Sequence, residues 1–205
     1  MAESDTDRNV HPWNGLTVPA AGDFTLDPEH ADVTFAVRYL MVTQIKGRFG
    51  DVRATLTLGE DPTASHVEVV VGTASLATGE DDRDQRLRSA DFFDVARHPE
   101  LTFRSTRITH VRGNEFVLAG DLTIRGTTRP VEFGASFDGV GFDPWGAQVV
   151  GLSARTEIDR ERWGLTWNRA LETGGVLIGK TVVLEIDAEF NRPAGSARET
   201  GNLAP

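Results

Sequence analysis

Charged side chains that could bind a polar group gather in one short segment, which runs from Gly79 to Arg107. Within it, Arg83, Arg86 and Arg88 stand among aspartates. A guanidinium group matches phosphate and carbonyl oxygens, so Arg83 or Arg86 could contact the polar head of a ligand. The alternative is a solvated surface helix held by ion pairs, in which Arg83 and Asp84 tie the segment to the rest of the fold.

Other reactive arrangements are missing from the sequence. The chain has no cysteine, which removes thiolate catalysis and cysteine-ligated zinc. Its five histidines share no metal spacing, and the acidic run at 80–84 lacks the glycine and the distal glutamate of a calcium loop. No helix is expected after Gly174-Gly175, which argues against a phosphate loop, and Ser153 stands in no G-x-S-x-G elbow. We therefore expect no catalytic residue, no bound metal and no required cofactor.

Length and charge limit the protein's partners. The 205 residues suit one domain with tails, and a net charge of −10 argues against nucleic acid, because phosphate binding needs a basic face. No apolar run reaches the roughly 18 residues that a transmembrane segment needs. The N-terminal residues lack the basic start and apolar core of a secretory signal, which predicts a cytoplasmic protein.

Apolar and polar residues alternate with a period of two over most of the chain, which indicates strands with one dry and one wet face. The clearest runs begin at Val33, Val52, Val67, Leu101, Phe116, Val131, Val150 and Val182. Turn signals separate them, for example Arg112-Gly113-Asn114 and Asp138-Gly139. About eight antiparallel strands joined by short turns predict a sandwich or an up-and-down barrel.

Strand length and small side chains favour a long barrel with an internal cavity. The run 48–58 would form one strand of eleven residues, about 37 Å long and roughly twice the typical length. A barrel of about eight strands is just wide enough to be filled by side chains or to hold one ligand. The predicted inward positions include small residues, which favour the cavity: Ala36, Ala54, Gly120, Ala135 and Ala154.

The segment 81–89 is the one convincing helix in the sequence. Asp81 or Asp82 is expected to cap it, because acidic groups suit the N-terminal end of a helix. Leu87 is its one strongly apolar residue, so the helix needs Phe92 and Phe93 to pack against the sheet. A short helix across one end of a barrel would act as a lid or a plug.

The two ends of the chain show no periodicity. Residues 1–21 combine prolines, glycine and small polar residues, and they are predicted to form a flexible N-terminal arm. Residues 191–205 are predicted to form a disordered C-terminal tail for the same reasons. The folded domain is therefore expected at residues 22–190.

Five blocks of this domain resemble, in order, the signature of the YceI-like proteins: GDFTLDPEHADVTFAVRYLM, IKGRFGDVRATLTL, GEDDRDQRLRSADFFDVARHPELTFRST, GDLTIRGTTRPVEF and IDRERWGL. The resemblance implies an all-β fold, an elongated eight-stranded antiparallel lipocalin-like barrel with one short helix. It also implies that the protein binds, sequesters or carries a long hydrophobic ligand in an internal apolar tunnel. A polyisoprenoid, an isoprenoid quinone or a similar lipid would suit such a tunnel and would be found co-bound.

The resemblance and the alternation together suggest a set of tunnel-lining residues: Phe35, Val37, Tyr39, Phe49, Leu87, Phe92, Phe93, Phe103, Leu122, Ile124, Phe133 and Trp163. The alternative is that these side chains fill a closed core. Trp163 and Trp167 would share one face of a strand. Trp163 would line the cavity or its mouth, or the two would form an aromatic core pair. Tyr39 stands where the family often has a histidine, so it would offer a hydroxyl group to the head of a ligand.

Two further hypotheses come from other classes of protein. An enzyme acting on a quinone or lipid head group would use Tyr39, Asp84 or an arginine as acid or base. A barrel filled by side chains would instead serve as a protein-interaction module. A homodimer is compatible with each hypothesis, and no residue argues for it.

Overall fold

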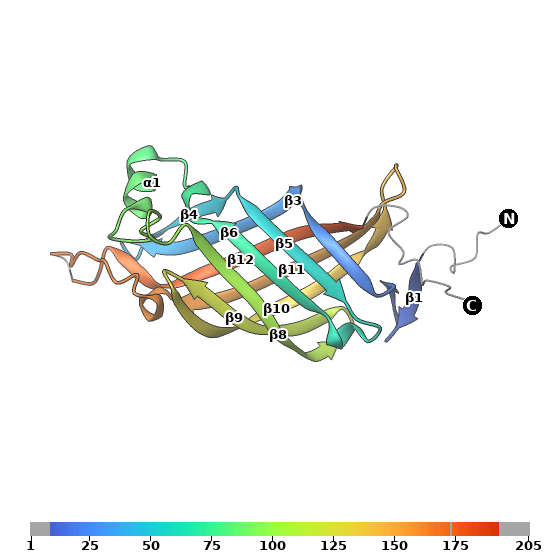
Figure 1. Cartoon of the computed structure of the whole chain (residues 1–205). Coiled ribbons are helices and arrows are strands. Elements are labelled where there is room, and N and C mark those ends of the chain that lie inside the picture. The colour runs from blue at the N-terminus through green and yellow to red at the C-terminus, as the bar shows by residue number, and fades with distance from the viewer. Residues whose placement is uncertain (1–8, 173, 193–205) are drawn as a thin grey trace, which may run out of the picture.

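A closed antiparallel barrel of eight strands dominates the computed structural model, which describes residues 9–172 and 174–192 (Figure 1). Around the barrel the strands follow the order β3 (Gly22–Tyr39), β5 (Val52–Leu58), β6 (His66–Gly72), β8 (Glu100–Arg112), β9 (Glu115–Ile124), β10 (Thr127–Phe142), β11 (Gln148–Asp159) and β12 (Ile178–Arg192). Pairing of β12 with β3 closes the barrel. The predicted eight-stranded antiparallel barrel is confirmed.

The barrel is elongated because several of its strands are long. β3 has 18 residues, β10 has 16 and β12 has 15, where a typical strand has about five or six. The single strand predicted at 48–58 is wrong, because the chain breaks at Gly50 and Asp51. There the Gly50 amide donates to Ser75 Oγ at 3.1 Å, and the Asp51 carbonyl accepts from the Gly72 amide at 2.9 Å.

This break separates β5 from β4 (Thr43–Phe49). The second half of β3 pairs with β4, whereas the first residues of β3 pair with β5. β4 also pairs with the short strand β7 (Leu76–Ala77) at the end of the barrel where the α-helix lies. Beside the second half of β3, the sheet at that end therefore continues into β4 and then β7.

Alternation along the strands places one set of side chains inside. Val37, Phe35 and Val33 on β3 pair with Val182, Leu184 and Ile186 on β12, and all six face inward. Ala36, expected inside, stands between inward residues and therefore faces out.

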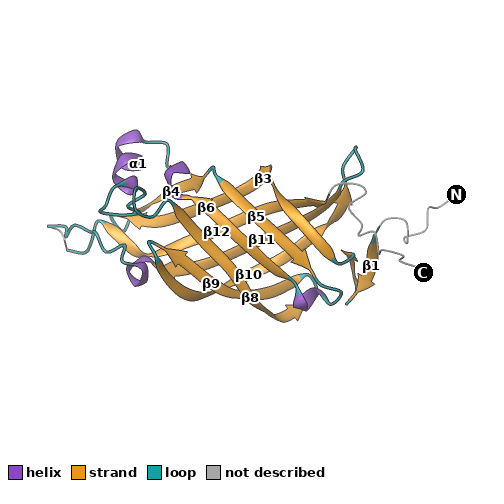
Figure 2. Cartoon of the chain, in the orientation of Figure 1, coloured by secondary structure: helices purple, strands orange, loops and turns teal. Residues whose placement is uncertain are grey.

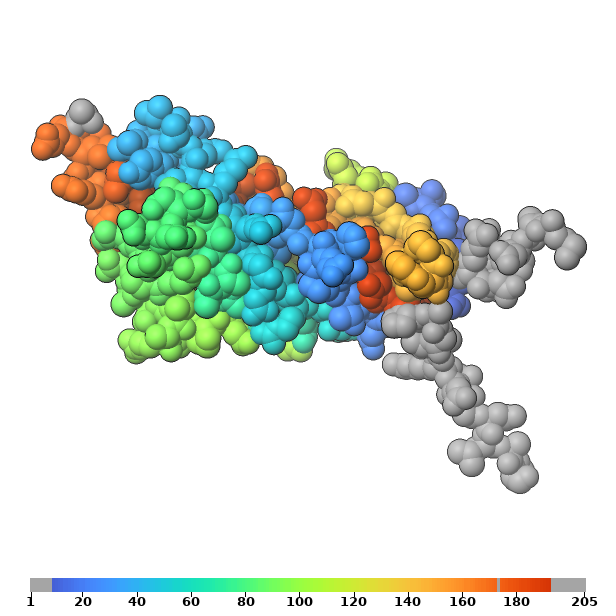
Figure 3. All heavy atoms as spheres, turned by 90° about the horizontal axis from the view of Figure 1, so that it is seen from above, coloured from blue at the N-terminus to red at the C-terminus, as the bar shows by residue number. Residues whose placement is uncertain are grey.

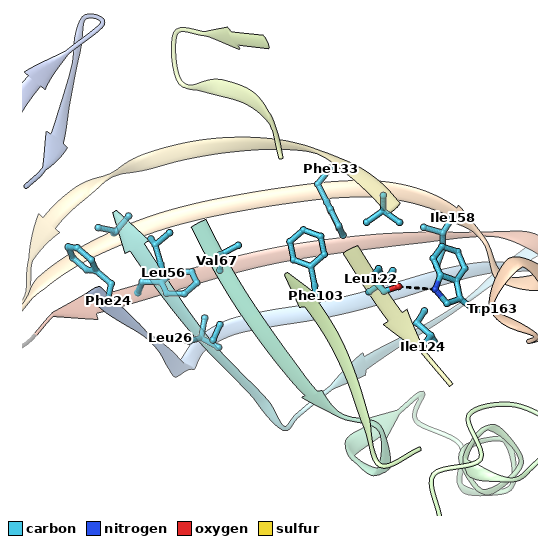
Figure 4. Close-up of a cluster of buried hydrophobic side chains, with 14 of the residues drawn as sticks. Phe24, Leu26, Leu56, Val67, Phe103, Leu122, Ile124, Phe133, Ile158 and Trp163 are labelled. Atoms are coloured by element: carbon cyan, nitrogen blue, oxygen red, sulfur yellow. Dashed lines mark hydrogen bonds between the residues drawn. The ribbon is translucent and has the colours of Figure 1, made fainter. Parts of the chain in front are cut away.

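Gly120 does face inward, but its space is already filled. A Cβ atom there would meet ring atoms of Phe103 at 2.5 Å. Figure 4 shows the ring of Phe103 beside that of Phe133, and their centroids lie 5.2 Å apart.

The α-helix α1 (Asp81–Arg88) lies at one end of the barrel (Figure 2). Its cap is Glu80, whose carboxylate accepts from the amides of Asp82 and Arg83, so the predicted aspartate cap is wrong. Phe93 packs edge-on against Phe49 at 5.9 Å between ring centroids, and Phe92 is buried. Three short 3₁₀ helices complete the described helices: η2 (Pro62–Ala64), η3 (Thr73–Ser75) and η4 (Arg160–Trp163).

A β-hairpin occupies the opposite end of the molecule, where a flexible arm was predicted. β1 (Val10–Trp13) pairs with β2 (Leu16–Pro19) around the turn Asn14-Gly15, whose φ angles are 48° and 81°. Asn-Gly is the preferred pair in such left-handed turns. Val18 is buried, so residues 10–19 are a folded part of the domain, and residues 1–8 lie outside the described chain.

The end of the described chain also extends the domain slightly. β12 runs to Arg192, so residues 191 and 192 of the predicted tail belong to the barrel, and residues 193–205 lie outside the described chain. Across residues 9–172 and 174–192, no helix is long and apolar enough to cross a membrane.

Candidate functional site

A cavity of about 800 Å³, which we call the tunnel, runs inside the barrel. Its size is typical of a site that binds a small organic molecule. Aliphatic and aromatic side chains make up most of its wall. Phe35, Leu184 and Ile186 face inward yet are only partly buried, because the tunnel leaves space beside them.

The residues predicted to line a tunnel border this cavity, with one exception. Those in its wall are Phe35, Val37, Tyr39, Phe49, Leu87, Phe92, Phe93, Phe103, Leu122, Ile124 and Phe133. Small side chains at Ala54, Ala135 and Ala154 widen the interior between the larger ones. The barrel is therefore not filled by its own side chains.

Trp163 is the exception, and it belongs to the core. Its side chain is buried, and its indole N–H donates to the Leu122 carbonyl at 3.1 Å, as Figure 4 shows. The expectation of one strand carrying both tryptophans is wrong, because η4 ends at Gly164 with a φ of 75°. That left-handed turn leaves Trp163 in the core and places Trp167 in the tunnel wall.

The tunnel reaches the surface at the end of the barrel that carries α1. The exposed residues on its border all lie there, and we call this set the mouth: Thr43, Gln44, Glu80, Asp82 and Arg86. They come from β4, from α1 and from the residue that caps it. A long ligand would therefore place its polar end at the mouth and its tail inside.

Three charged side chains of α1 hold the helix in place. The Asp84 carboxylate is buried and accepts from the amide and the hydroxyl of Thr78 at 2.9 and 2.5 Å. Arg83 Nε donates to the same hydroxyl at 2.7 Å, and Arg88 Nε donates to the Ala74 carbonyl at 3.0 Å. Arg83 borders the tunnel, but its hydrogen bonds to Thr78 attach α1 to the residues before it.

Arg86 has a different environment from Arg83. Its guanidinium carbon lies 4.0 Å from the centre of the Trp167 ring, a cation–π distance. Its ion pair to Asp91, at 3.3 Å, joins two half-exposed side chains. Tyr39 and Arg86, the other two predicted head-group residues, also border the tunnel.

Arg160 is a tunnel residue that sequence reasoning missed. Its side chain is buried, and it donates to the carbonyls of Gly179 at 2.9 Å, Trp167 at 3.1 Å and Leu165. Burial lowers the pKa of Arg160, and the nearby acids Glu161 and Asp159 partly oppose this effect. The arginine fixes the loop that carries Trp167. The charged block IDRERWGL is the sequence signal that could have identified it.

One group of side chains outside the tunnel has the composition of a metal site. Asp27, His30 and Glu189 place their ligand atoms within 4.8 Å of one another. His30 Nδ1 lies 3.1 Å from Asp27 Oδ2 and 3.8 Å from Glu189 Oε1. The His30 hydrogen bond lowers the pKa of Asp27, and Asp27 in turn raises the pKa of His30. Pairing of a histidine with carboxylates thus accounts for the group without an ion.

Comparison with known proteins agrees with this architecture. The model of the YceI-like domain matches residues 24–190. A UPF0312 protein of Staphylococcus epidermidis is 39% identical over 171 residues, which cover 82% of this chain and 96% of the relative.

Two solved structures share the fold at lower identity. BcnA of Burkholderia cenocepacia has a TM-score of 0.68 at 19% identity, covering 80% of this chain and 98% of that protein. A polyisoprenoid binding domain from Saccharophagus degradans, implicated in plant cell wall breakdown, has a TM-score of 0.60 at 16% identity. That comparison covers 83% of this chain and 98% of the domain.

Proposed function

Because the chain belongs to the YceI-like domain family, we propose that its tunnel binds a long hydrophobic ligand, a polyisoprenoid, an isoprenoid quinone or a similar lipid. The observation that carries this proposal is an apolar tunnel of about 800 Å³ inside a barrel that its own side chains leave open. The polyisoprenoid binding domain with the same fold supports the choice of ligand class.

Hydrophobic burial alone can supply the affinity. Each CH₂ group that moves from water into the tunnel contributes about 0.8 kcal/mol. A tail of many carbons therefore binds well without any reacting residue. Such a protein would sequester or carry its ligand unchanged.

The mouth would select the polar end of the ligand. Tyr39 offers a hydroxyl group, and Arg86 offers a guanidinium group that suits carbonyl or phosphate oxygens. Asp84, a candidate acid or base, already accepts two hydrogen bonds from Thr78. We therefore assign the mouth a role in orientation.

The test is to identify what the protein carries. Protein purified from cells without detergent should release a long-chain lipid on organic extraction, and mass spectrometry would give its mass. The stripped protein should then bind an added isoprenoid quinone. An empty protein that also fails to take up isoprenoid quinones would disprove the proposal.

A matched pair of variants links binding to the tunnel. Ala154 is a small residue of the tunnel wall, and its neighbour Arg155 points outward and is exposed. Ala154→Phe should block the tunnel and remove the co-purified lipid. Arg155→Phe adds the same ring to the outer face and should leave the lipid bound.

A further inference from the structure

An exposed apolar turn stands beside the mouth of the tunnel. Leu40, Met41 and Val42, which we call the apolar tip, join β3 to β4. The exposed fraction is 60% for Met41 and 76% for Val42. Figure 3 shows this turn, in light blue, at the same end of the molecule as the loop around residue 170, in orange. The Leu40 amide donates to the Leu177 carbonyl of that loop at 2.8 Å.

Folding alone does not explain these residues. Leu40 and Met41 have φ angles of 52° and 62°, and the Val42 amide closes the turn on the Tyr39 carbonyl at 3.1 Å. Consecutive residues in this left-handed region favour asparagine and glycine. The chain places two large apolar residues there and exposes them to water. Backbone strain of this kind, in non-glycine residues with positive φ angles, points to a function for those residues.

Basic residues stand directly behind the tip. Arg38, Lys46 and Arg48 are exposed on β3 and β4, and we call them the basic collar. Between Val33 and Gly50 the chain has these three basic residues and no acidic one, although the whole protein carries a net charge of −10. Among the described residues, no ion pair involves the collar.

We propose that the apolar tip inserts into an anionic lipid bilayer and so brings the mouth of the tunnel to the membrane surface. Apolar side chains that enter the boundary between head groups and acyl chains, backed by basic residues, are the features of a peripheral membrane contact. Arg38 and Lys46 lie about 7 and 14 Å behind the tip along their strands, within reach of lipid phosphates.

Acidic residues at and beside the mouth limit the orientation of the protein on the membrane. Glu80, Asp81 and Asp82 are exposed at the start of α1. An anionic surface repels them, so the β3–β4 side would approach the bilayer while α1 tilts away. A second copy of the protein fits the tip poorly, because a stable interface needs about 20 to 30 residues from each partner.

The inference rests on the proposed function, because a membrane contact would give the tunnel access to a ligand that resides in membranes. The test of membrane binding does not depend on the identity of that ligand. Vesicles of phosphatidylcholine alone and of equal parts phosphatidylcholine and phosphatidylglycerol contain no isoprenoid. The protein should sediment with the anionic vesicles and much less with the neutral ones. Lipid extraction decides the identity of the ligand separately.

The informative variant is Leu40→Asn with Met41→Gly. It introduces the residues that the turn favours, so the melting temperature should stay the same or rise, while binding to anionic vesicles should fall about tenfold or more. Lys46→Gln should weaken binding about fivefold. Trp145→Asn is the control, because Trp145 is 85% exposed. It belongs to the turn 143–147 between β10 and β11, a segment that lies at the opposite end of the molecule (Figure 3).

Several results would overturn the inference. They are wild-type protein that stays in solution with anionic vesicles, a double variant that binds as tightly as the wild type, and equal binding to neutral vesicles. Loss of binding in Trp145→Asn alone would assign the contact to the other end. Sedimentation velocity without vesicles completes the test: a dimer that the double variant abolishes would assign the tip to self-association.

Discussion

The guanidinium group of Arg86 lies over the ring of Trp167, with 4.0 Å between the guanidinium carbon and the ring centre. The contact joins α1 to the loop after η4, across the mouth of the tunnel. Trp167 also lies 5.4 Å from Phe92, measured between ring centroids. The helix is therefore attached on both sides, to Thr78 by hydrogen bonds and to the loop by Trp167.

This contact should be measurable as a coupling energy. In a double-mutant cycle of Arg86→Met and Trp167→Leu, we expect a coupling of about 0.5–1 kcal/mol in the free energy of unfolding, measured in urea. The same cycle with Arg83→Met should show none, because Arg83 is bonded to Thr78. Equal coupling for both arginines would contradict the assignment.

Thr78 is predicted to be the main attachment point of α1. Thr78→Val removes the hydroxyl that donates to buried Asp84 and accepts from Arg83. We expect a loss of about 1–3 kcal/mol in the free energy of unfolding, because a buried charged group loses a partner. Thr57→Val is the control, since its hydroxyl donates to Asp23 at an exposed site, and it should cost about 0.5 kcal/mol. Equal losses would show that Asp84 is not held as described.

Gly120 is predicted to reserve space for an aromatic ring of the tunnel wall. Gly120→Ala would bring a Cβ atom to 2.5 Å from both the ring of Phe103 and the Arg104 carbonyl. Overpacking of this kind costs about 1–3 kcal/mol, measured as the free energy of unfolding. At Gly141 a Cβ atom meets nothing within 4 Å, so Gly141→Ala should change stability by less than about 0.5 kcal/mol. A neutral Gly120→Ala would mean that both the Phe103 ring and the Arg104 backbone shift without cost.

The strands were predictable because alternation is a local consequence of strand geometry. Phe35 and Val37 show it, since each residue's face follows from its position in a strand. The break at Gly50 and Asp51 was not predictable, because its hydrogen bonds come from residues 72 and 75. Those partners are known only once the barrel is closed.

The residues of the candidate site likewise divide into those that the sequence predicts and those that it does not. Most of the tunnel wall lies on long strands, where alternation identifies the inward residues. Trp163 and Arg160 lie instead in the 3₁₀ helix η4. The sequence Trp-Gly-Leu-Thr-Trp alternates apolar and small or polar residues as a strand does, so the pattern alone predicts a strand there. The N-terminal hairpin was missed although Asn14-Gly15 is a strong turn signal, because its short strands contain prolines.

The pair of Asp27 and His30 predicts how stability depends on pH. The pKa of His30 is raised above 6.5 by its hydrogen bond to Asp27. The contribution of His30 to the stability of the fold is therefore complete below pH 6.5, and it is lost as the pH rises through the pKa of His30 in the folded protein.

The pKa of Asp27 is lowered below 3.8, chiefly by its hydrogen bond to His30, so its contribution is present above pH 3.8 and is lost as pH falls through the folded value. The pair should therefore stabilise the fold most between pH 3.8 and 6.5. Melting temperatures of the wild type and His30→Gln should differ most inside this window and converge outside it. His66→Gln removes an exposed histidine from β6 and is the control. A difference between wild type and His30→Gln that stays constant from acid to alkaline pH would show that the pair contributes nothing through its charges.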